Sequence, residues 1–515
     1  MTFLRKTIFT SPLKTTLALL VPSFVLFVKT LSFDFTSFDE QWLIFQNAPF
    51  IAKWSSIIDA FTKPMTASYY RPFLVLSFIV DYHLGKLSPT IYHFTNLCLH
   101  LASVYLLFSF LLSCNIDKKT AFLSSLLFSV HPLILHATVW VPGRNDLILC
   151  VFSLLSLIHL NNFITRNNIK FFALHVLFFC CSLFTKENAV ALPVIFLFLY
   201  ITRPHSKNKI FYLCLFAWIV LSVLFLQMRN HVIPISTFNI SAKGVKDFFL
   251  AFIQFIGKTM LPFNQSILPK TNTLSVFIGL GSMAMLIFLA AKFGFKDKKL
   301  ALLGLFIFVA LLIIPVWFGA FKSSGEHYEH RAYTSLAGFM LFLSQLKFDI
   351  ESRRFQSIFL GIFCVFFIKS FTRTNIYRNP STYIDRGLKE RPDFYLFYHQ
   401  KSQNLYKAGK YIETLPLLAK AIALRPDKAE LYGNRSSSEF MLGMYQEAID
   451  DLNMAISKSD FRIEYYLNRC MVYNKIGDIE NALKDYAILK QYYGDKIPAS
   501  LQKSLNEKWE TSNKK

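Results

Sequence analysis

The sequence lacks Cys-x-x-Cys pairs and other Cys/His spacings typical of a metal centre, which argues against a structural zinc site. Most of its 8 cysteines lie inside apolar runs, where cysteine behaves as a small hydrophobic residue. A nucleotide-binding glycine motif and a clear Asp-x-Asp motif are also missing. Charged side chains are scarce, at 17% of residues against 53% hydrophobic, and this balance excludes an ordinary soluble protein.

Apolar runs fill residues 1–372, whereas residues 373–515 have the composition of a soluble helical domain. Runs of about 20 residues match the hydrocarbon thickness of a bilayer. The apolar stretch from Thr15 to Phe33 is long for a signal-peptide core, and no clear cleavage site follows it. We therefore predict an all-α, polytopic membrane bundle that begins with this stretch.

Eleven membrane spans are predicted, which places the two ends of the chain on opposite sides of the bilayer. The basic loops then gather weakly on the side of the N-terminus, as the positive-inside rule expects. Residues 247–262 are interpreted as re-entrant or interfacial, because a full span there would reverse the orientation of everything downstream. The predicted spans are 13–32, 89–113, 120–139, 146–163, 171–185, 188–202, 210–228, 274–291, 300–318, 333–346 and 356–371.

The net charge of +23 comes largely from basic residues in short loops between the predicted spans. Membrane orientation and anionic lipid phosphates explain this placement better than nucleic acid does, so we expect no nucleic-acid partner. Basic residues on the face opposite the N-terminus would suit a phosphate-bearing ligand. The alternative is ordinary solvated loop charge.

The C-terminal part contains an internal repeat. Tyr398, Tyr432 and Tyr466 are spaced by 34 residues, and a glycine follows each tyrosine at a constant distance. This is the period of tetratricopeptide (TPR) helical hairpins, which stack into an α-solenoid. The predicted domains are a membrane domain at 1–372, a connector at 373–394, three TPR-like repeats at 395–500 and a polar tail at 501–515.

The first large loop carries two motifs of possible chemical use. Phe38-Asp39-Glu40 follows the first span, and a carboxylate at the membrane boundary suits a general base for a hydroxyl acceptor. Arg71, which follows two tyrosines later in the loop, has the fork geometry that binds phosphate bidentately. The alternative for the acidic pair is a solvated surface.

Three polar residues near the start of the second span, His93, Asn96 and His100, share one helix face by their spacing. Polar side chains within a span normally face protein or a water-filled cavity. A substrate contact by His93 and hydrogen bonding between helices are both open interpretations.

Further charged clusters follow along the chain, in Gly143-Arg144-Asn145-Asp146, in Lys186-Glu187 and in the segment from Tyr328 to Tyr333. The predicted topology places all of these clusters on the same face as Asp39. The loops of the other face carry plain basic charge. This convergence is more informative than any single motif.

The order of these motifs, with His131-Pro132 between them and the repeats behind them, resembles the transmembrane-and-TPR glycosyltransferases. This family contains the TMTC O-mannosyltransferases and bacterial relatives, within the GT-C superfamily. The resemblance covers nearly the whole chain. It implies a polyprenyl-phosphate-linked mannose or similar hexose as donor, bound within the membrane. We expect no further cofactor and assign no metal-binding residues, and the sequence leaves a metal requirement open.

The resemblance also implies roles for individual residues. Asp39 would be the catalytic base, with Glu40 beside it. Arg144 and Asp146 correspond to the family's Gly-Arg-x-Asp-type loop. Lys186 and Arg331 would stabilise the leaving phosphate. The remaining substrate-site candidates are Arg71, His93, His330 and Tyr333.

One residue departs from the family pattern. Relatives usually carry a glutamate five residues after the histidine of the His-Pro pair, and this chain has His136 there. The exchange weakens what the resemblance implies about donor or acceptor specificity, and it does not conflict with the overall reaction.

The leading hypothesis is an inverting transfer of the sugar to an exported protein, with the TPR-like array binding the acceptor or a partner. Transfer to a lipid or surface glycan and a non-catalytic membrane-anchored scaffold are the alternatives. We expect a bacterial inner membrane with a periplasmic array, or otherwise an endoplasmic reticulum membrane with a lumenal one.

Overall fold

The computed structural model describes residues 9–64, 69–202, 208–233, 240–321, 327–459, 461–493 and 497–512, in two compact units, 1–383 and 384–515. Within these ranges the regular elements are helices, apart from isolated β-bridge pairing such as that between Phe295 and Leu346. The predicted all-α class is therefore confirmed.

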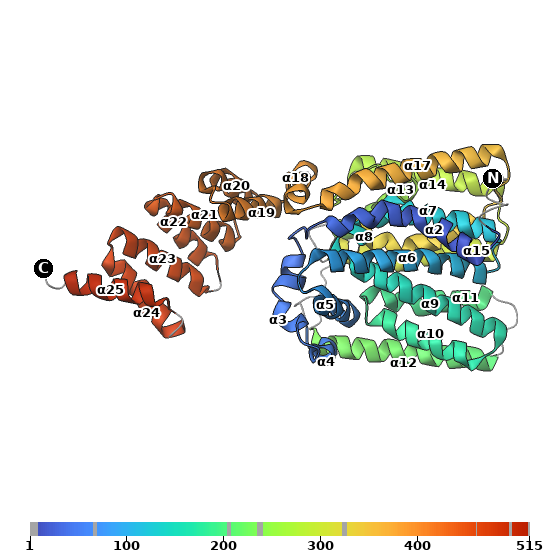
Figure 1. The fold of residues 1–515 in the computed structure, drawn as a ribbon, viewed down its shortest axis with the longest axis horizontal. Coiled ribbons are helices and arrows are strands. Elements are labelled where there is room, and N and C mark those ends of the chain that lie inside the picture. The colour runs from blue at the N-terminus through green and yellow to red at the C-terminus, as the bar shows by residue number, and fades with distance from the viewer. Residues whose placement is uncertain are drawn as a thin grey trace. The chain divides into compact units, whose positions relative to one another are not determined.

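Long apolar helices lie side by side in the first unit (Figure 1). Among the described residues, seven helices are long and apolar enough to cross a bilayer. An eighth crossing results if α7 (Lys118–Val130) and Pro132–Val139 form one span bent by 50°. The chain is thus a polytopic membrane protein. The seven are α2 (Pro12–Phe27) with the turn after it, α6 (Pro89–Ser113), α9 (Arg144–Arg166), α12 (Asn208–Val232), α14 (Thr273–Phe293), α15 (Lys298–Phe321) and α17 (Arg353–Arg373).

The other three predicted spans are also helices but are shorter. They are α10 (Ile169–Leu183), α11 (Leu192–Thr202) and α16 (Tyr333–Ser344), with 15, 11 and 12 residues. All eleven predicted segments are therefore helical. A full crossing by each of these three helices stays a prediction, because a straight helix needs about 20 residues to span the hydrocarbon core.

All but the last two of residues 247–262 belong to α13 (Ala242–Met260), which is not among the helices that are both long and apolar enough to cross a bilayer. Near its start, Gly244 lies against Phe321, and near its end the ammonium of Lys258 is 2.6 Å from the carboxylate of Glu329. Both ends of α13 thus approach the connection between α15 and α16. This arrangement agrees with the interpretation of a segment that does not cross.

The apolar stretch after Arg71 is a helix, α5 (Pro72–Gly85). Its Leu74, Val75 and Phe78 are buried in the hydrophobic core with residues of the first loop. Proline favours the start of this helix, because an N–H at the first helical position would have no hydrogen-bond acceptor within the helix.

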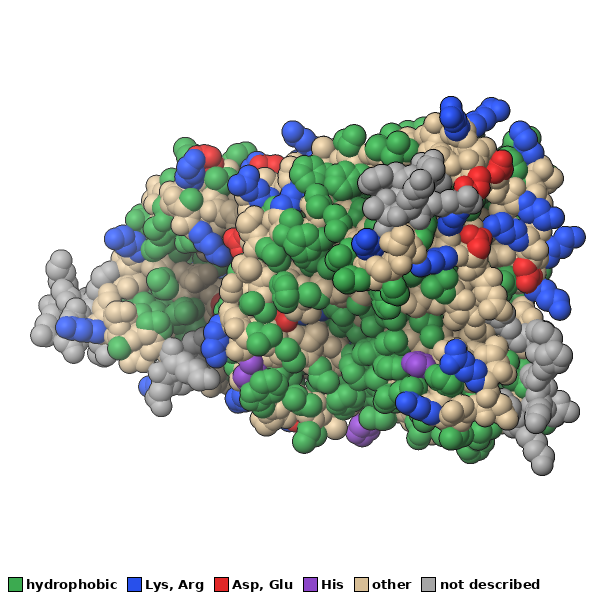
Figure 2. All heavy atoms as spheres, turned by 45° about the vertical axis from the view of Figure 1, so that its right-hand side comes forward, with side chains coloured by type: hydrophobic (Ala, Val, Ile, Leu, Met, Phe, Trp, Pro, Cys, Tyr) green, Lys and Arg blue, Asp and Glu red, His purple; other side chains and the backbone are tan. Residues whose placement is uncertain are grey.

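Three basic loops meet at one end of the bundle. The backbone N–H groups of Lys296 and Lys347 donate to the carbonyls of Gln345 and Gly294, at 2.7 and 3.2 Å. Lys296 also pairs with Asp117, at 3.3 Å. Figure 2 shows basic side chains gathered towards this end and hydrophobic side chains over much of the middle of the visible face. The predicted grouping of these loops on one side is confirmed.

The second unit consists of helical hairpins. Gly409, Gly443 and Gly477 all have positive φ, between 74° and 84°, where the chain turns from the first to the second helix of a hairpin. The recurring glycine is thus required by a left-handed backbone conformation. The helices are α19 (Tyr395–Lys407), α20 (Tyr411–Leu424), α21 (Ala429–Met441), α22 (Tyr445–Ser457), α23 (Ile463–Ile476), α24 (Ile479–Tyr493) and α25 (Ala499–Ser512).

The segment expected to be a polar tail differs from that expectation. Most of it lies in α25, where Leu501 and Leu505 are buried with Cys470 and Ala482 of the last hairpin. The two leucines are four residues apart and therefore lie on one helix face. Helix α25 therefore covers the apolar end of the stack of hairpins.

Close packing of α15 on α16 generates a stability prediction. A Cβ at Gly304 would lie 2.5 Å from the backbone nitrogen of Phe342 and 2.7 Å from the carbonyl oxygen of Gly338. We expect Gly304→Val to destabilise the bundle by about 1–3 kcal/mol, a typical cost of overpacking. The measurement is the thermal unfolding midpoint in detergent. Gly281→Val in α14 is the control, since a Cβ there meets nothing within 4 Å; equal midpoints would contradict the prediction.

Candidate active site

A cavity of about 500 Å³ lies at the end of the bundle opposite the basic loops. Its walls come from the first loop, the turn before α9, the connection after α10, the end of α12 and the residues that flank the α15–α16 connection. Its polar and aromatic lining residues are Asp39, Trp42, Tyr69, Arg71, Trp140, Asn145, Lys186, Glu187, Asn188, Arg229, Phe318, Tyr328, His330 and Arg331.

The two acids of the first loop have different surroundings. Asp39 lines the cavity, and its backbone carbonyl accepts from the N–H groups of Trp42 and Leu43 at the start of the helical turn η2 (Gln41–Phe45). Glu40 points into the protein and is fully buried. We therefore assign different roles to these neighbours.

Glu40 anchors the loop. Its carboxylate accepts from the hydroxyl of Thr36, at 2.8 and 3.0 Å, and from the backbone N–H of Phe38, at 3.1 Å. Burial raises the pKa of this carboxyl, although these donors oppose the rise. Because Glu40 lies outside the cavity lining, the structure fits a positioning role and gives no direct support to its predicted catalytic role.

Two ion pairs hold cations at the cavity. Both Nε and a terminal nitrogen of Arg71 donate to one carboxylate oxygen of Glu187, at 3.3 and 3.2 Å. The ammonium of Lys186 donates to both carboxylate oxygens of Asp146, at 2.6 Å. Asp146 thus lies next to the cavity and is linked to it through its ion pair with Lys186.

Burial changes the proton affinities of the bases at this site. Desolvation lowers the pKa of Lys186 to about 8, although Asp146 opposes the fall. Burial and the nearby His136 and Lys186 lower the pKa of His330 well below its usual range. His330 is therefore a neutral hydrogen-bonding group at pH 7, and its Nε2 is 3.9 Å from Asp146.

Arg331 and Arg229 complete the basic lining. A terminal nitrogen of Arg331 donates to the carbonyl of Pro315, at 3.1 Å, and its guanidinium lies 5.0 Å from the ring centroid of Tyr328. Together with Arg71 and Lys186 they give four cationic side chains among the described lining residues, against the carboxylates of Asp39 and Glu187. The cavity therefore favours an anionic ligand.

Arg144 does not line the cavity. Its guanidinium is fully buried and pairs with Asp81 at 2.5 Å. It also donates to the side chains of Asn96 and Ser77 and to the carbonyl of Tyr92, at 2.7, 3.2 and 2.7 Å. These contacts join α5, α6 and α9. The structure thus gives Arg144 a bundle-joining role in place of the expected phosphate contact.

His93 and Tyr333 are also outside the lining. His93 Nε2 is 3.4 Å from the carbonyl of Asp34, and the hydroxyl of Tyr333 is 2.7 Å from His100 Nδ1. Asn96 is bonded to Arg144 in the same region. For this face of α6, the structure therefore shows bonding between elements, one of the two interpretations left open by the sequence.

His136 stands behind the cavity. Its ring centroid is 4.8 Å from that of His330 and 4.8 Å from that of Trp140. Neither ring nitrogen has a hydrogen-bond partner within the described part of the chain. The residue that departs from the family pattern thus packs directly behind a residue of the lining.

The sequence reasoning missed several lining residues, and Arg229 is the clearest case. It lies in the last turn of α12, at the end that faces the cavity. The available signal was a basic residue at the site-side end of a long apolar helix. Trp42, Trp140 and Asn188 had no distinctive pattern in the sequence. Within the described ranges, three or more His, Cys, Asp or Glu side chains nowhere form a metal-binding group.

Comparison with known proteins supports the resemblance. A family model for dolichyl-phosphate-mannose-protein mannosyltransferases matches residues 82–226. This range includes Arg144, Asp146 and Lys186, whereas Asp39 and Arg331 lie outside it.

Individual relatives match parts of the chain. Human protein O-mannosyl-transferase TMTC3 is 39% identical over 85 residues, which are 16% of this chain and 9% of the relative. Human TMTC2 is 33% identical over 141 residues, 26% of this chain and 17% of the relative. The Caenorhabditis elegans protein O-mannosyl-transferase F38B6.6 is 25% identical over 193 residues, 35% and 27% of the two chains. The chain thus spans at most about a quarter of the length of these relatives, and within that part it is TMTC-like.

The buried pair of Asp81 and Arg144 generates a second stability prediction. Asp81→Ala would leave a buried guanidinium without its counter-charge, so we expect a loss of about 3–5 kcal/mol of stability. Asp59→Ala is the control, because Asp59 pairs with Lys63 on the surface, where a salt bridge contributes about 0–1 kcal/mol. Thermal unfolding of both variants in detergent checks the difference. Similar midpoints would contradict the prediction and mean that another group compensates the buried charge of Arg144.

Proposed function

We propose that this chain is an integral-membrane glycosyltransferase that moves mannose or a similar hexose from a polyprenyl phosphate to a hydroxyl group of an exported protein. One observation carries the proposal. The cavity gathers an acid, Asp39, with Arg71, Lys186 and Arg331, from segments far apart in the chain. A transfer from a sugar phosphate needs this combination of a base and phosphate-binding cations.

In the proposed reaction, Asp39 takes the proton of the acceptor hydroxyl while that oxygen attacks the anomeric carbon. The bond between the anomeric carbon and the phosphate oxygen breaks in the same step, and its electron pair leaves with the phosphate. Attack opposite the leaving group inverts the configuration of the anomeric carbon. Protonated Asp39 releases its proton to solvent after the product leaves.

Cations of the lining stabilise the charge that develops on the phosphate. Arg71, Lys186 and Arg331 come from different elements, so they can surround one phosphate group. Arg229 adds a fourth cation that the sequence motifs did not include. Neutral His330 is suited to donate or accept a hydrogen bond to the sugar.

The helical hairpins of the second unit are proposed to form a TPR-like array that binds the acceptor protein or a partner. Binding of a protein by this array would favour a protein acceptor over the alternative, a lipid or cell-surface glycan. A bacterial inner membrane, with the cavity and array on the periplasmic side, is the proposed location; an endoplasmic reticulum membrane with both in the lumen is the alternative.

Removal of the proposed base provides the main test. We expect Asp39→Asn to reduce sugar transfer by about 10²–10⁴-fold, the usual contribution of a general base. The assay uses purified full-length protein and radiolabelled polyprenyl-phosphate sugars. Asp34→Asn is the matched control, because Asp34 lies in the same loop outside the cavity lining and should keep near wild-type activity.

Full activity of Asp39→Asn would contradict the proposed mechanism, and no transfer by the wild type with any such donor would favour the scaffold alternative. Mass spectrometry of exported proteins from a strain without this chain distinguishes the acceptor classes. Loss of a hexose from serine or threonine residues supports a protein acceptor. Unchanged proteins together with an altered glycan profile would overturn it.

The lowered pKa of Lys186 predicts the alkaline limit of activity. A lysine with a pKa of about 8 is charged below this pH and loses its proton as the pH rises through it. We therefore expect turnover to fall above about pH 8, well before an ordinary lysine would titrate. Lys186→Arg, if it folds with an unchanged thermal midpoint, should move this limb to higher pH. A pH–rate profile of both proteins is the measurement, and coincident alkaline limbs would assign the limit to another group.

A further inference from the structure

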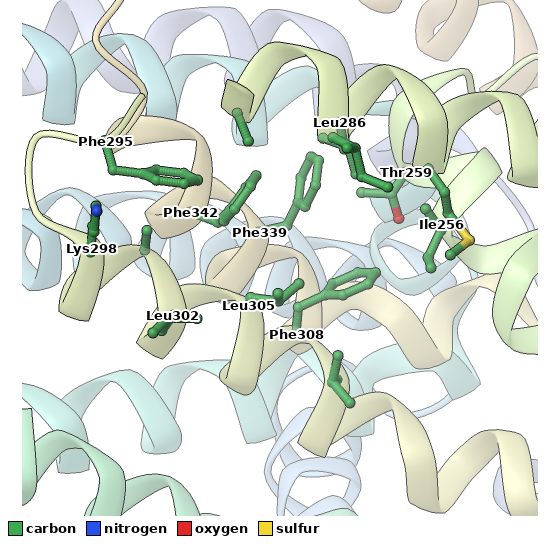
Figure 3. A pocket seen from close by; sticks show the side chains of 15 residues that line it. Ile256, Thr259, Leu286, Phe295, Lys298, Leu302, Leu305, Phe308, Phe339 and Phe342 are labelled. Carbon is green, nitrogen blue, oxygen red and sulfur yellow. The ribbon is translucent and has the colours of Figure 1, made fainter. Parts of the chain in front are cut away.

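A second cavity, of about 480 Å³, lies within the helical part of the first unit, away from the candidate active site. Its side chains come from α13, α14, α15 and α16 and are almost all hydrocarbon (Figure 3). Figure 3 shows Leu286 of α14 facing Leu305 and Phe308 of α15 across it, with Phe339 and Phe342 of α16 between them. We call this cavity the α14–α15 groove.

The groove exists because α14 is held along only part of its length. A Cβ at Gly257 of α13 would lie 2.8 Å from Cα of Gly279, so the first half of α14 packs closely against α13. The groove residues of α14 come later in the helix, and Ile287 among them is 68% exposed. On α15, Leu302 is 56% exposed. The groove therefore opens to the side of the bundle, where the hydrocarbon of the membrane lies.

One end of the groove is basic. Lys298 and Phe295 lie at this end, whereas Ile256 and Thr259 lie at the other (Figure 3). The side chain of Lys298 is exposed, and its ammonium has no hydrogen-bond or ion-pair partner among the described residues. Its neighbour Lys296 is engaged with Asp117 and Thr120. A cation at the end of a hydrocarbon-lined groove suits a lipid that carries a phosphate.

The length of the groove distinguishes between two lipids. Lys298 and Val309 mark its extent along α15, a rise of about 16 Å at 1.5 Å per residue. This is roughly half of the 30 Å hydrocarbon core, or one leaflet. A polyprenyl-phosphate donor would have its phosphate at the candidate active site, which uses Pro315 and Phe318 of the same helix. The basic end of the groove is at the opposite face.

We propose that the α14–α15 groove binds an anionic glycerophospholipid of the leaflet on the basic-loop side. One acyl chain occupies the groove, and the phosphate lies at Lys298. The lipid supplies the packing that α14 lacks and ties it to α15. This site is independent of the proposed sugar transfer, because no donor or acceptor is involved.

Native mass spectrometry of the full-length protein in mild detergent tests the site. The protein is mixed with equal amounts of phosphatidylglycerol and phosphatidylcholine that carry the same acyl chains. We expect the wild type to retain one phosphatidylglycerol in preference to phosphatidylcholine. Lys298→Ala should reduce that preference about fivefold, the order expected for one basic residue near a membrane surface. Lys299→Ala should not, because Lys299 does not line the groove.

A bulky substitution tests the groove itself. Leu302→Trp should fill it and abolish retention of the phospholipid, whereas Leu280→Trp, at an exposed position of α14 outside the lining, should leave retention unchanged. Size-exclusion profiles and thermal midpoints show whether each variant is folded. Equal retention of the two lipids by the wild type, or equal retention by Leu302→Trp and Leu280→Trp, would overturn the proposal. Displacement of phosphatidylglycerol by added polyprenyl phosphate would also overturn it and assign the groove to the donor chain.

Discussion

Charges buried in an apolar bundle must be paired, and this requirement organises the membrane unit. Among the described residues, three such pairs are buried: Arg144 with Asp81, Lys186 with Asp146, and Lys258 with Glu329. Each pair joins segments distant in the sequence. Removing either partner leaves an uncompensated charge, so the segments that carry them are constrained to meet.

These pairs also build the candidate active site. The connection after α10 is fixed to α9 by Lys186 and Asp146, and the connection before α16 is fixed to α13 through Glu329. Glu329 also accepts from the backbone N–H of Ser266, at 3.1 Å. The lining residues next to these pairs, Glu187 and His330, are thereby held at the cavity. The rigidity of the site thus comes from ion pairs that lie mainly behind its surface.

Sequence reasoning found most of the helices because their apolar runs are long and their ends carry polar residues. It also found the shared face of Asp39, Lys186 and Arg331, since alternating spans place every second loop on one side. Sequence reasoning was less successful in predicting which neighbour a polar side chain within a helix contacts. Arg144 and Asp146 are separated by one residue, yet one binds α5 and α6 while the other supports the cavity.

The reason is that helix packing decides which neighbour a polar side chain meets. The hydrophobic pattern of α6 places His93, Asn96 and His100 on one face, but it does not state whether a cavity or another helix covers that face. For the hairpins of the second unit local sequence was sufficient, because the repeat fixes the contacts, whereas it missed the helix α25 in the segment expected to be a polar tail. Arg435 and Asp451 form a two-point pair at 2.6 and 2.7 Å, and Arg469 and Asp485 repeat it one hairpin later.

The pairing of Arg71 with Glu187 affects which anions the cavity can accept. In the protein without ligand, Glu187 occupies the guanidinium that an incoming group would need. The phosphodiester of a polyprenyl-phosphate sugar carries a single negative charge and gains little by competing for Arg71 alone with a carboxylate already in place. It gains more when Lys186 and Arg331 of the same lining attract it at the same time. Glu187 is thus a competitor for Arg71, and an anion can replace it only by engaging the neighbouring cations as well.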